Sequence, residues 1–184
     1  KNEMKIYGIE LMGTTTIMNV NNAINVEIDE GITSVSTVMQ QLKEMTTCKL
    51  PSTLTTINTE SFQECVKLQS ITIPTNVTEI GTGVFGGCTS LTTIEVETMN
   101  TNYKSISGVL FNNNGSELIQ YPNGKEGNTY TIPDEVITMK DKSFYKNTVL
   151  HEIKFNDKLE TIGISAFEGV TNVRSITIKS NITS

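Results

Sequence analysis

Residues 68–90 read LQSITIPTNVTEIGTGVFGGCTS, and residues 150–172 read LHEIKFNDKLETIGISAFEGVTN. The two segments carry apolar residues at the same places: Leu68, Ile71, Ile73, Val77, Ile80, Phe85 and Cys88 correspond to Leu150, Ile153, Phe155, Leu159, Ile162, Phe167 and Val170. Segments that share one apolar pattern at a fixed period are typical of repeat proteins, in which each repeat buries its apolar side against its neighbours. The sequence therefore predicts a solenoid.

Further copies of the pattern set the period and the domain organisation. Residues 45–67 and 127–149 fit the same register, and Phe144 lies 23 residues before Phe167. A degenerate copy precedes residue 45 and a partial one follows residue 172. We therefore expect residues 1–44 to form an N-terminal cap with a degenerate first repeat. Residues 45–184 then form the repeats, with a hairpin insertion at about 97–126.

The spacing within one copy predicts the local structure of a coil. Ile71, Thr72 and Ile73 alternate between apolar and polar, as in a strand with one buried face, and Pro74 ends that strand because it lacks an N–H group. The later apolar positions suit a short extended or 3-10 stretch that leads into a tight helical turn. Stacking of equivalent strands should build a parallel sheet along one side.

The repeated pattern, Leu-x-x-Ile-x-Ile-Pro followed by Phe-x-x-Cys, resembles the BspA-like subclass of leucine-rich repeats over residues 45–182. Asn156 departs from it at the proline, and Asn147 and Val170 depart at the cysteine. The resemblance implies an α/β, β-rich leucine-rich-repeat solenoid, a right-handed horseshoe with its parallel sheet on the concave side and short helical or 3-10 turns on the convex side. It also implies an extracellular or cell-surface microbial protein used for adhesion or protein binding.

Charge and composition exclude several classes of partner. The net charge of −6 and the interspersed lysines argue against nucleic acid, because nucleic-acid binding rewards clustered Lys and Arg. No apolar run is long enough to insert directly into a membrane. The chain begins at Lys1 without a start methionine, so we expect it to be a fragment whose targeting sequence is not included.

Reactive residues are too few and too scattered for catalysis. His151 is the only histidine and lies about three coils from Cys48, Cys65 and Cys88, which excludes a simple Cys–His pair. A zinc site needs four ligands with short paired spacings, so we expect no metal and no cofactor. The favoured interpretation of the cysteines is that they are small buried hydrophobes, and the alternative is a disulfide between Cys65 and Cys88. The sequence therefore predicts a protein that is not an enzyme.

Strand alternation predicts which residues face outward, and hence where a ligand could bind. The tentative binding face on the concave side consists of Ser70, Thr72, Thr93, Glu95, Thr131, His151, Glu152, Lys154, Arg174 and Thr177. A second, tentative surface is the insertion, where aromatic residues gather at Tyr103, Phe111 and Tyr121.

We expect the partner to be a host or cell-surface protein, with end-to-end self-association as a further possibility. Two alternatives for the function remain open at this point. One is a structural spacer within a larger surface protein, and the other is an accessory domain that binds polysaccharide.

Overall fold

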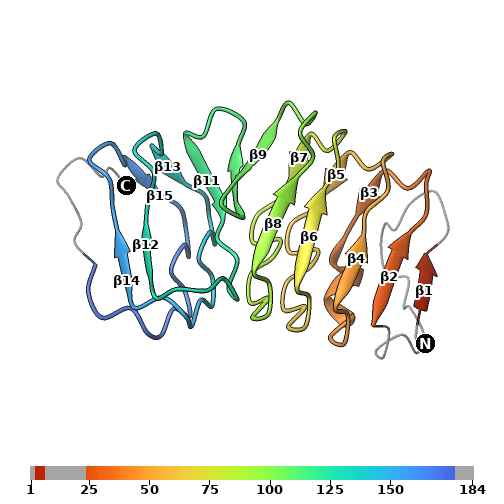
Figure 1. The fold of residues 1–184 in the computed structure, drawn as a ribbon, viewed down its shortest axis with the longest axis horizontal. Helices are drawn as coiled ribbons and strands as arrows, with labels where there is room; N and C mark the ends of the chain where they lie inside the picture. The colour runs from red at the N-terminus through yellow and green to blue at the C-terminus, as the bar shows by residue number, and fades with distance from the viewer. Residues whose placement is uncertain (1–2, 7–23, 177–184) are drawn as a thin grey trace.

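The structure is a computed structural model that describes residues 3–6 and 24–176. The chain winds into a β-solenoid of about six turns with mostly parallel strands. Figure 1 shows the coils following one another along the long axis, with the N-terminal strands at one end and the C-terminal strands at the other. Within the described residues, no helix is long and apolar enough to cross a membrane.

The first strand of each coil belongs to one of two parallel sheets. The N-terminal main sheet contains, in spatial order, β1 (Glu3–Ile6), β2 (Asn25–Ile28), β4 (Thr47–Lys49), β6 (Ser70–Ile73) and β8 (Thr93–Val96). The C-terminal main sheet contains β12 (Thr129–Thr131) and β14 (Glu152–Lys154). In β6, Ile71 and Ile73 are buried while Ser70 and Thr72 are exposed, which confirms the alternation that the sequence predicts.

The second strand of each coil is shorter and builds two further sheets. One sheet is parallel and consists of β3 (Ser34–Val35), β5 (Thr56–Ile57) and β7 (Glu79–Ile80). The other is mixed and runs, in spatial order, through β15 (Thr161–Ile162), β13 (Thr138–Met139), β11 (Glu117–Gln120), β10 (Val109–Asn112) and β9 (Tyr103–Ile106). Residues 7–23 of the predicted N-terminal cap lie outside the described residues.

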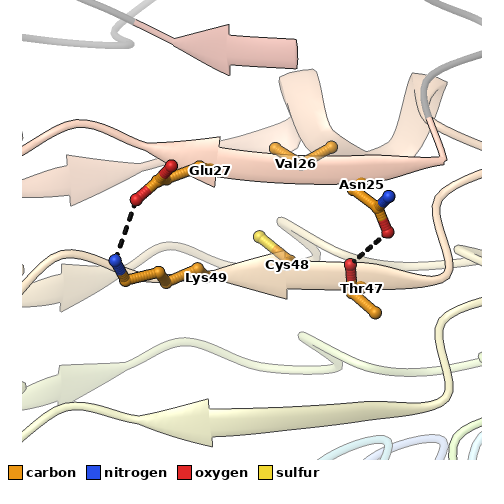
Figure 2. A pocket seen from close by; sticks show the side chains of 6 residues that line it. All are labelled: Asn25, Val26, Glu27, Thr47, Cys48 and Lys49. Carbon is orange, nitrogen blue, oxygen red and sulfur yellow. Dashed lines mark hydrogen bonds and ion pairs between the residues drawn. The ribbon is translucent and has the colours of Figure 1, made fainter. Parts of the chain in front are cut away.

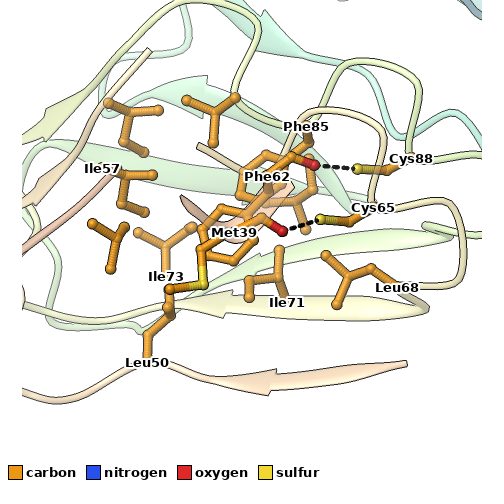
Figure 3. Packing of buried hydrophobic residues seen from close by; sticks show 14 of the residues in the cluster. Met39, Leu50, Ile57, Phe62, Cys65, Leu68, Ile71, Ile73, Phe85 and Cys88 are labelled. Atoms are coloured by element: carbon orange, nitrogen blue, oxygen red, sulfur yellow. Dashed lines mark hydrogen bonds between the residues drawn. The ribbon is translucent and has the colours of Figure 1, made fainter. Parts of the chain in front are cut away.

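The core lies between these sheets and is organised by stacked aromatic rings. Phe62 stacks on Phe85 with ring centroids 5.5 Å apart, and Phe144 stacks on Phe167 at the same distance. Figure 3 shows this packing in the N-terminal coils, together with two thiols that each donate to a backbone carbonyl one coil away. Cys65 and Cys88 are free and fully buried, as the favoured interpretation holds, whereas Cys48 is only half-buried.

The prediction of helical or 3-10 turns is not confirmed for the return segments beyond one of them. Among the described residues the only helix is η1 (Thr37–Gln41), a 3-10 helix. The fold is therefore a β-solenoid, and the predicted α/β class is wrong. The other described returns are hydrogen-bonded turns that contain residues in the left-handed region, such as Glu60 (φ 58°) and Lys142 (φ 59°). A residue in the left-handed region ends a right-handed helical turn, because the chain that follows it no longer continues along the helix axis.

The longest coil holds the insertion, and the chain returns to the repeat pattern at Tyr121, before the predicted end of the insertion at about residue 126. β9 and β10 form an antiparallel hairpin, and β11 pairs antiparallel with β10 but parallel with β13 of the next coil. Tyr121 then stacks on Phe144 at 5.2 Å, in the ring position that Phe85 fills in its own coil. Tyr121 is therefore a member of the ring stack.

Candidate binding face

The outward residues of the N-terminal main sheet lie side by side in two rows. Ser70 pairs with Thr93, and Thr72 pairs with Glu95, in a parallel in-register arrangement. Ser70, Thr72 and Glu95 are exposed, and Thr93 is partly exposed. The structure therefore brings these four predicted residues together on one surface, which we call the N-terminal patch.

The C-terminal main sheet and its flanks hold the other predicted residues. Thr131 pairs with Lys154, and Glu152 forms a bridge with Ser175. The members that the structure describes are all exposed, and we call them the C-terminal patch: Thr131, His151, Glu152, Lys154 and Arg174. Thr177 lies outside the described residues.

The two patches lie on separate sheets, although the sequence placed their residues on one binding face. The next position beside β8 is taken by the β9–β10 turn, where Gly108 accepts a hydrogen bond from the Ile94 amide at 2.9 Å. Gly108 has φ +80°, and a Cβ at this position would come within 2.7 Å of Thr93 Oγ1. The hairpin therefore approaches β8 where β12 would otherwise pair, and the main sheet is split in two.

Charges on this face are largely compensated. Lys49 Nζ lies 2.8 Å from Glu27 Oε1 across β2 and β4, and this hydrogen-bonded pair raises the pKa of Lys49. Lys154 Nζ lies 3.7 Å from a Glu152 carboxylate oxygen, and Thr93 donates to Glu95 at 2.6 Å. Exposed ion pairs of this kind add little stability, so their main effect is to leave a polar face without a strong field.

The face is hollowed only slightly. A hollow of about 260 Å³ lies along β2 and β4, and Figure 2 shows its side chains spread over the two strands, with dashed lines joining Glu27 to Lys49 and Asn25 to Thr47. A second hollow of about 280 Å³ includes Ser70 and Thr72. A third hollow of about 350 Å³ includes Glu95. Pockets that enclose a small ligand are mostly apolar, whereas these hollows are lined largely by polar residues, so this surface is better suited to contact with another macromolecule.

The insertion does not provide the aromatic surface that the sequence suggests. Phe111 and Tyr121 are buried, with 0% and 2% of their surface exposed, because the hairpin packs its aromatic side chains into the core. Tyr103 is half-buried, and its hydroxyl accepts from the Ile80 amide at 3.0 Å and donates to the Thr78 carbonyl at 3.3 Å. These three residues hold the hairpin in place, and Phe111 and Tyr121 cannot contact a ligand.

The described residues offer no assembled reactive centre. No group of three His, Cys, Asp or Glu side chains in residues 3–6 and 24–176 could hold a metal ion. His151 is exposed on the C-terminal patch, whereas Cys65 and Cys88 are buried in the N-terminal part of the core. Burial raises the pKa of the Cys65 thiol to about 12, which removes the thiolate that a nucleophile would need.

Sequence reasoning missed a set of ion pairs that spans three coils. Lys142 pairs with Glu60, and Lys146 pairs with Glu64, although 82 residues separate the members of each pair. The two lysine side chains cross the coil between them at Gly83 and Gly87, where a Cβ would meet Lys142 Cδ at 2.8 Å and Lys146 Cδ at 3.7 Å. The signal was present in the sequence, because Gly83 and Gly87 stand 23 residues after Glu60 and Glu64.

Comparison with known proteins places this geometry among repeat proteins. The sequence model of the BspA type leucine rich repeat region matches residues 10–130 and 120–184, in six copies. No curated protein shows a significant sequence match to the chain.

Solved structures show the same fold. The crystal structure of the pneumococcal vaccine antigen PcpA is 27% identical, with a TM-score of 0.80 over 86% of this chain and 40% of that chain. A leucine-rich cell surface protein from Faecalibacterium prausnitzii A2-165 is 33% identical, with a TM-score of 0.76 over 86% of this chain and 42% of that one. The present chain therefore spans less than half the length of either structure.

Proposed function

Because the chain belongs to the family of BspA-type leucine-rich repeat proteins, we propose that it is a non-catalytic module that binds another protein. The N-terminal patch and the C-terminal patch are the proposed contact surfaces. The observation that carries this proposal is the exposed, in-register pairing of Ser70 with Thr93 and of Thr72 with Glu95. Regular rows of exposed polar side chains on a rigid sheet favour recognition by an extended surface.

The proposed location is outside the cell or on its surface. Two similar proteins support it, since one is described as a vaccine antigen and the other as a cell surface protein. The free thiols of Cys65 and Cys88 do not oppose this location, because both are buried and protected from oxidants. Adhesion to a host is the corresponding role for the longer protein that would carry this module.

The test compares two variants with the same change in charge. Thr72→Arg with Glu95→Arg alters the N-terminal patch, and Thr78→Arg with Glu79→Arg alters exposed residues at the second strand of the same region. The probe is the labelled chain on fixed animal epithelial cells, before and after protease treatment of the cell surface. We expect the first variant to lose binding by about tenfold or more, as for a disrupted interface centre, and the second to bind like wild type.

The other outcomes separate the remaining functions. Binding that survives protease but is lost after glycosidase treatment would support a polysaccharide ligand and contradict a protein partner. Equal binding of both variants and wild type would exclude the N-terminal patch. Absence of binding by wild type would favour a structural spacer.

A further inference from the structure

Two Asn-Gly pairs lie in the same coil but in opposite environments. Asn114-Gly115 forms the turn between β10 and β11, and the Asn114 side chain is exposed. Asn123-Gly124 follows the ring of Tyr121, and Asn123 is only 1% exposed. In an Asn-Gly pair the backbone nitrogen of glycine can attack the side-chain amide of asparagine, because glycine has no side chain to hinder this nitrogen. The two pairs therefore form a natural comparison within one molecule.

We propose that Asn114-Gly115 is a self-modifying site at which Asn114 deamidates in the folded chain, whereas Asn123 is protected. The Gly115 amide nitrogen loses its proton to water and attacks Cγ of Asn114. The Cγ–Nδ2 bond breaks and ammonia leaves with the added proton, which closes a succinimide ring. Water then opens the ring at either carbonyl and gives aspartate or isoaspartate, so that no oxidant or further reactant is needed.

The turn already provides a hydrogen bond to the side-chain amide of Asn114, the group that is attacked. Asn114 Oδ1 accepts a hydrogen bond from the Ser116 amide at 2.9 Å. Negative charge develops on this oxygen as the ring closes, and a donor aimed at such an oxygen stabilises the transition state. The same hydrogen bond restricts the rotation of the Asn114 side chain, which reduces the entropy lost when the ring closes.

A positive charge lies beside the attacking residue. Lys104 on β9 is so close to Gly115 that a Cβ at Gly115 would come within 2.9 Å of Lys104 Nζ. A neighbouring ammonium group favours the deprotonated form of the Gly115 amide. One hydrogen bond opposes the reaction, from the Gly115 amide to the Asn112 carbonyl at 3.0 Å, and it belongs to a surface turn that can open locally.

The second pair lacks these features and is held in place. The Asn123 side chain donates to the Tyr145 carbonyl at 2.8 Å, and Asn123 Oδ1 is buried without a hydrogen-bond donor. The Gly124 amide donates to the Leu91 carbonyl at 2.8 Å. Backbone atoms of residues 89–91 lie within 2.8 Å of the place where a Gly124 Cβ would sit, so this glycine cannot turn toward the Asn123 amide.

The reaction changes the exposed turn between β10 and β11. A neutral amide at position 114 becomes a carboxylate close to Lys104, which adds one negative charge to this surface. Where isoaspartate forms, the backbone gains an extra carbon, and the turn between β10 and β11 changes shape. The site therefore gives the turn between β10 and β11 a slow, irreversible chemical change that the repeat core does not share.

The experiment follows both sites in the folded chain. The purified full chain is kept in mildly alkaline buffer below its unfolding temperature and then digested with trypsin. Cleavage after Lys104 and Lys125 releases one peptide, 105–125, that contains both Asn-Gly pairs, and its fragments report each site separately. We expect Asn114 to react more than about tenfold faster than Asn123. In urea-unfolded chain we expect the two rates to converge.

Variants separate the contributions to the rate. Asn114→Gln should abolish the early product, and Lys104→Arg should retain the rate because the charge is kept. Lys104→Gln should slow the reaction by roughly two- to fivefold, as expected for loss of one exposed charge interaction. Trypsin does not cleave after position 104 in this variant, so both sites are then followed in the longer peptide 68–125. Equal rates for Asn114 and Asn123 in the folded chain would overturn the proposal. An unchanged rate in Lys104→Gln would overturn the role of the lysine.

Discussion

At the scale of single residues, ring stacking links neighbouring coils. Phe62 and Phe85 lie at 5.5 Å and Tyr121 and Phe144 at 5.2 Å, and all four are buried. Within each pair the two rings come from neighbouring coils, so that the contact links one coil to the next. This is the interaction between neighbours on which a solenoid depends, because a single coil cannot bury its own apolar face.

Replacing Phe85 with alanine should therefore be costly. We expect Phe85→Ala to lower the free energy of unfolding by about 3–5 kcal/mol, the usual loss for a buried aromatic side chain. Urea unfolding followed by circular dichroism measures this change. Phe155→Ala, at a half-buried ring, serves as the control and should cost less. A loss below about 1 kcal/mol for Phe85→Ala would contradict its place in the ring stack.

Buried thiols should make stability depend on alkaline pH. Burial raises the pKa of Cys65 from 9.0 to about 12, so the folded chain keeps a proton that the unfolded chain releases above pH 9.0. Stability is therefore fully present below pH 9.0 and falls between the two values. The expected slope is about 1.4 kcal/mol per pH unit for this thiol.

The measurement is a series of urea unfolding curves from neutral to alkaline pH. Cys65→Ala should give a shallower decline than wild type, irrespective of its stability at neutral pH. The same decline in both proteins would show that Cys65 does not titrate on unfolding.

The sequence predicted which residues are buried better than it predicted which are exposed. The period alone placed Leu68, Ile71 and Phe85 in the core, and all three are buried. Phe111 was assigned to a surface because strand alternation within a hairpin does not say which side packs on the rest of the chain. Tyr121 carried a usable signal, since it lies 23 residues before Phe144.

At the scale of elements, buried asparagines complete the turns where proline is missing. Asn100 donates to the carbonyls of Pro74 and Val77 at 2.8 and 3.1 Å, and its Oδ1 accepts from the amides of Asn102 and Tyr103. Asn156, which departs from the repeat pattern, donates in the same way to Pro133 and Val136. The departure is thus explained by hydrogen bonds to the preceding coil, which a pattern of single residues does not reveal.

Removal of one such side chain should lower the stability of the folded chain. Asn100→Ala leaves buried backbone groups without partners, and we expect a loss of about 1–3 kcal/mol in the free energy of unfolding. Thermal or urea unfolding measures it. Asn113→Ala, in the exposed turn of the hairpin, is the matched control and should change stability by less than about 0.5 kcal/mol. Equal effects of the two changes would refute the role of Asn100.

Close stacking of the turns also restricts glycine positions. A Cβ at Gly81 would lie 2.2 Å from the backbone nitrogen of Thr59 in the preceding coil, and backbone cannot move aside cheaply. We expect Gly81→Ala to cost about 1–3 kcal/mol, as overpacking does elsewhere. Thr98→Ala on the surface should stay within about 0.5 kcal/mol of wild type in the same urea assay. A neutral Gly81→Ala variant would mean that these coils are farther apart.

The turns were the elements least accessible to prediction. Apolar spacing around Val84 and Phe85 suits a helical turn, but left-handed residues at equivalent positions of several coils divert the chain. Several of these residues are not glycine, for example Glu60 and Lys142, so residue type gave little warning. Their conformation depends on hydrogen bonds between coils, such as that from the Glu60 amide to the Thr82 carbonyl.

At the scale of the whole molecule, the hairpin determines how the polar surface is divided. The repeat predicted the outward rows correctly within each main sheet, because strand register follows from the period. It did not predict that the β9–β10 turn would stand between β8 and β12 and separate the N-terminal patch from the C-terminal patch. A partner that spans both patches would therefore contact the hairpin as well.

Cysteine cross-linking tests this arrangement most directly. Adjacent strands in a sheet are about 4.8 Å apart, within the range that a disulfide can bridge. In a chain with Cys48→Ala, we predict that Thr72→Cys with Glu95→Cys forms a disulfide on mild oxidation, because these residues are paired on β6 and β8. Glu95→Cys with Thr131→Cys should remain reduced, because the hairpin separates β8 from β12. Cross-linking of the second pair and not the first would contradict both the register and the two-patch surface.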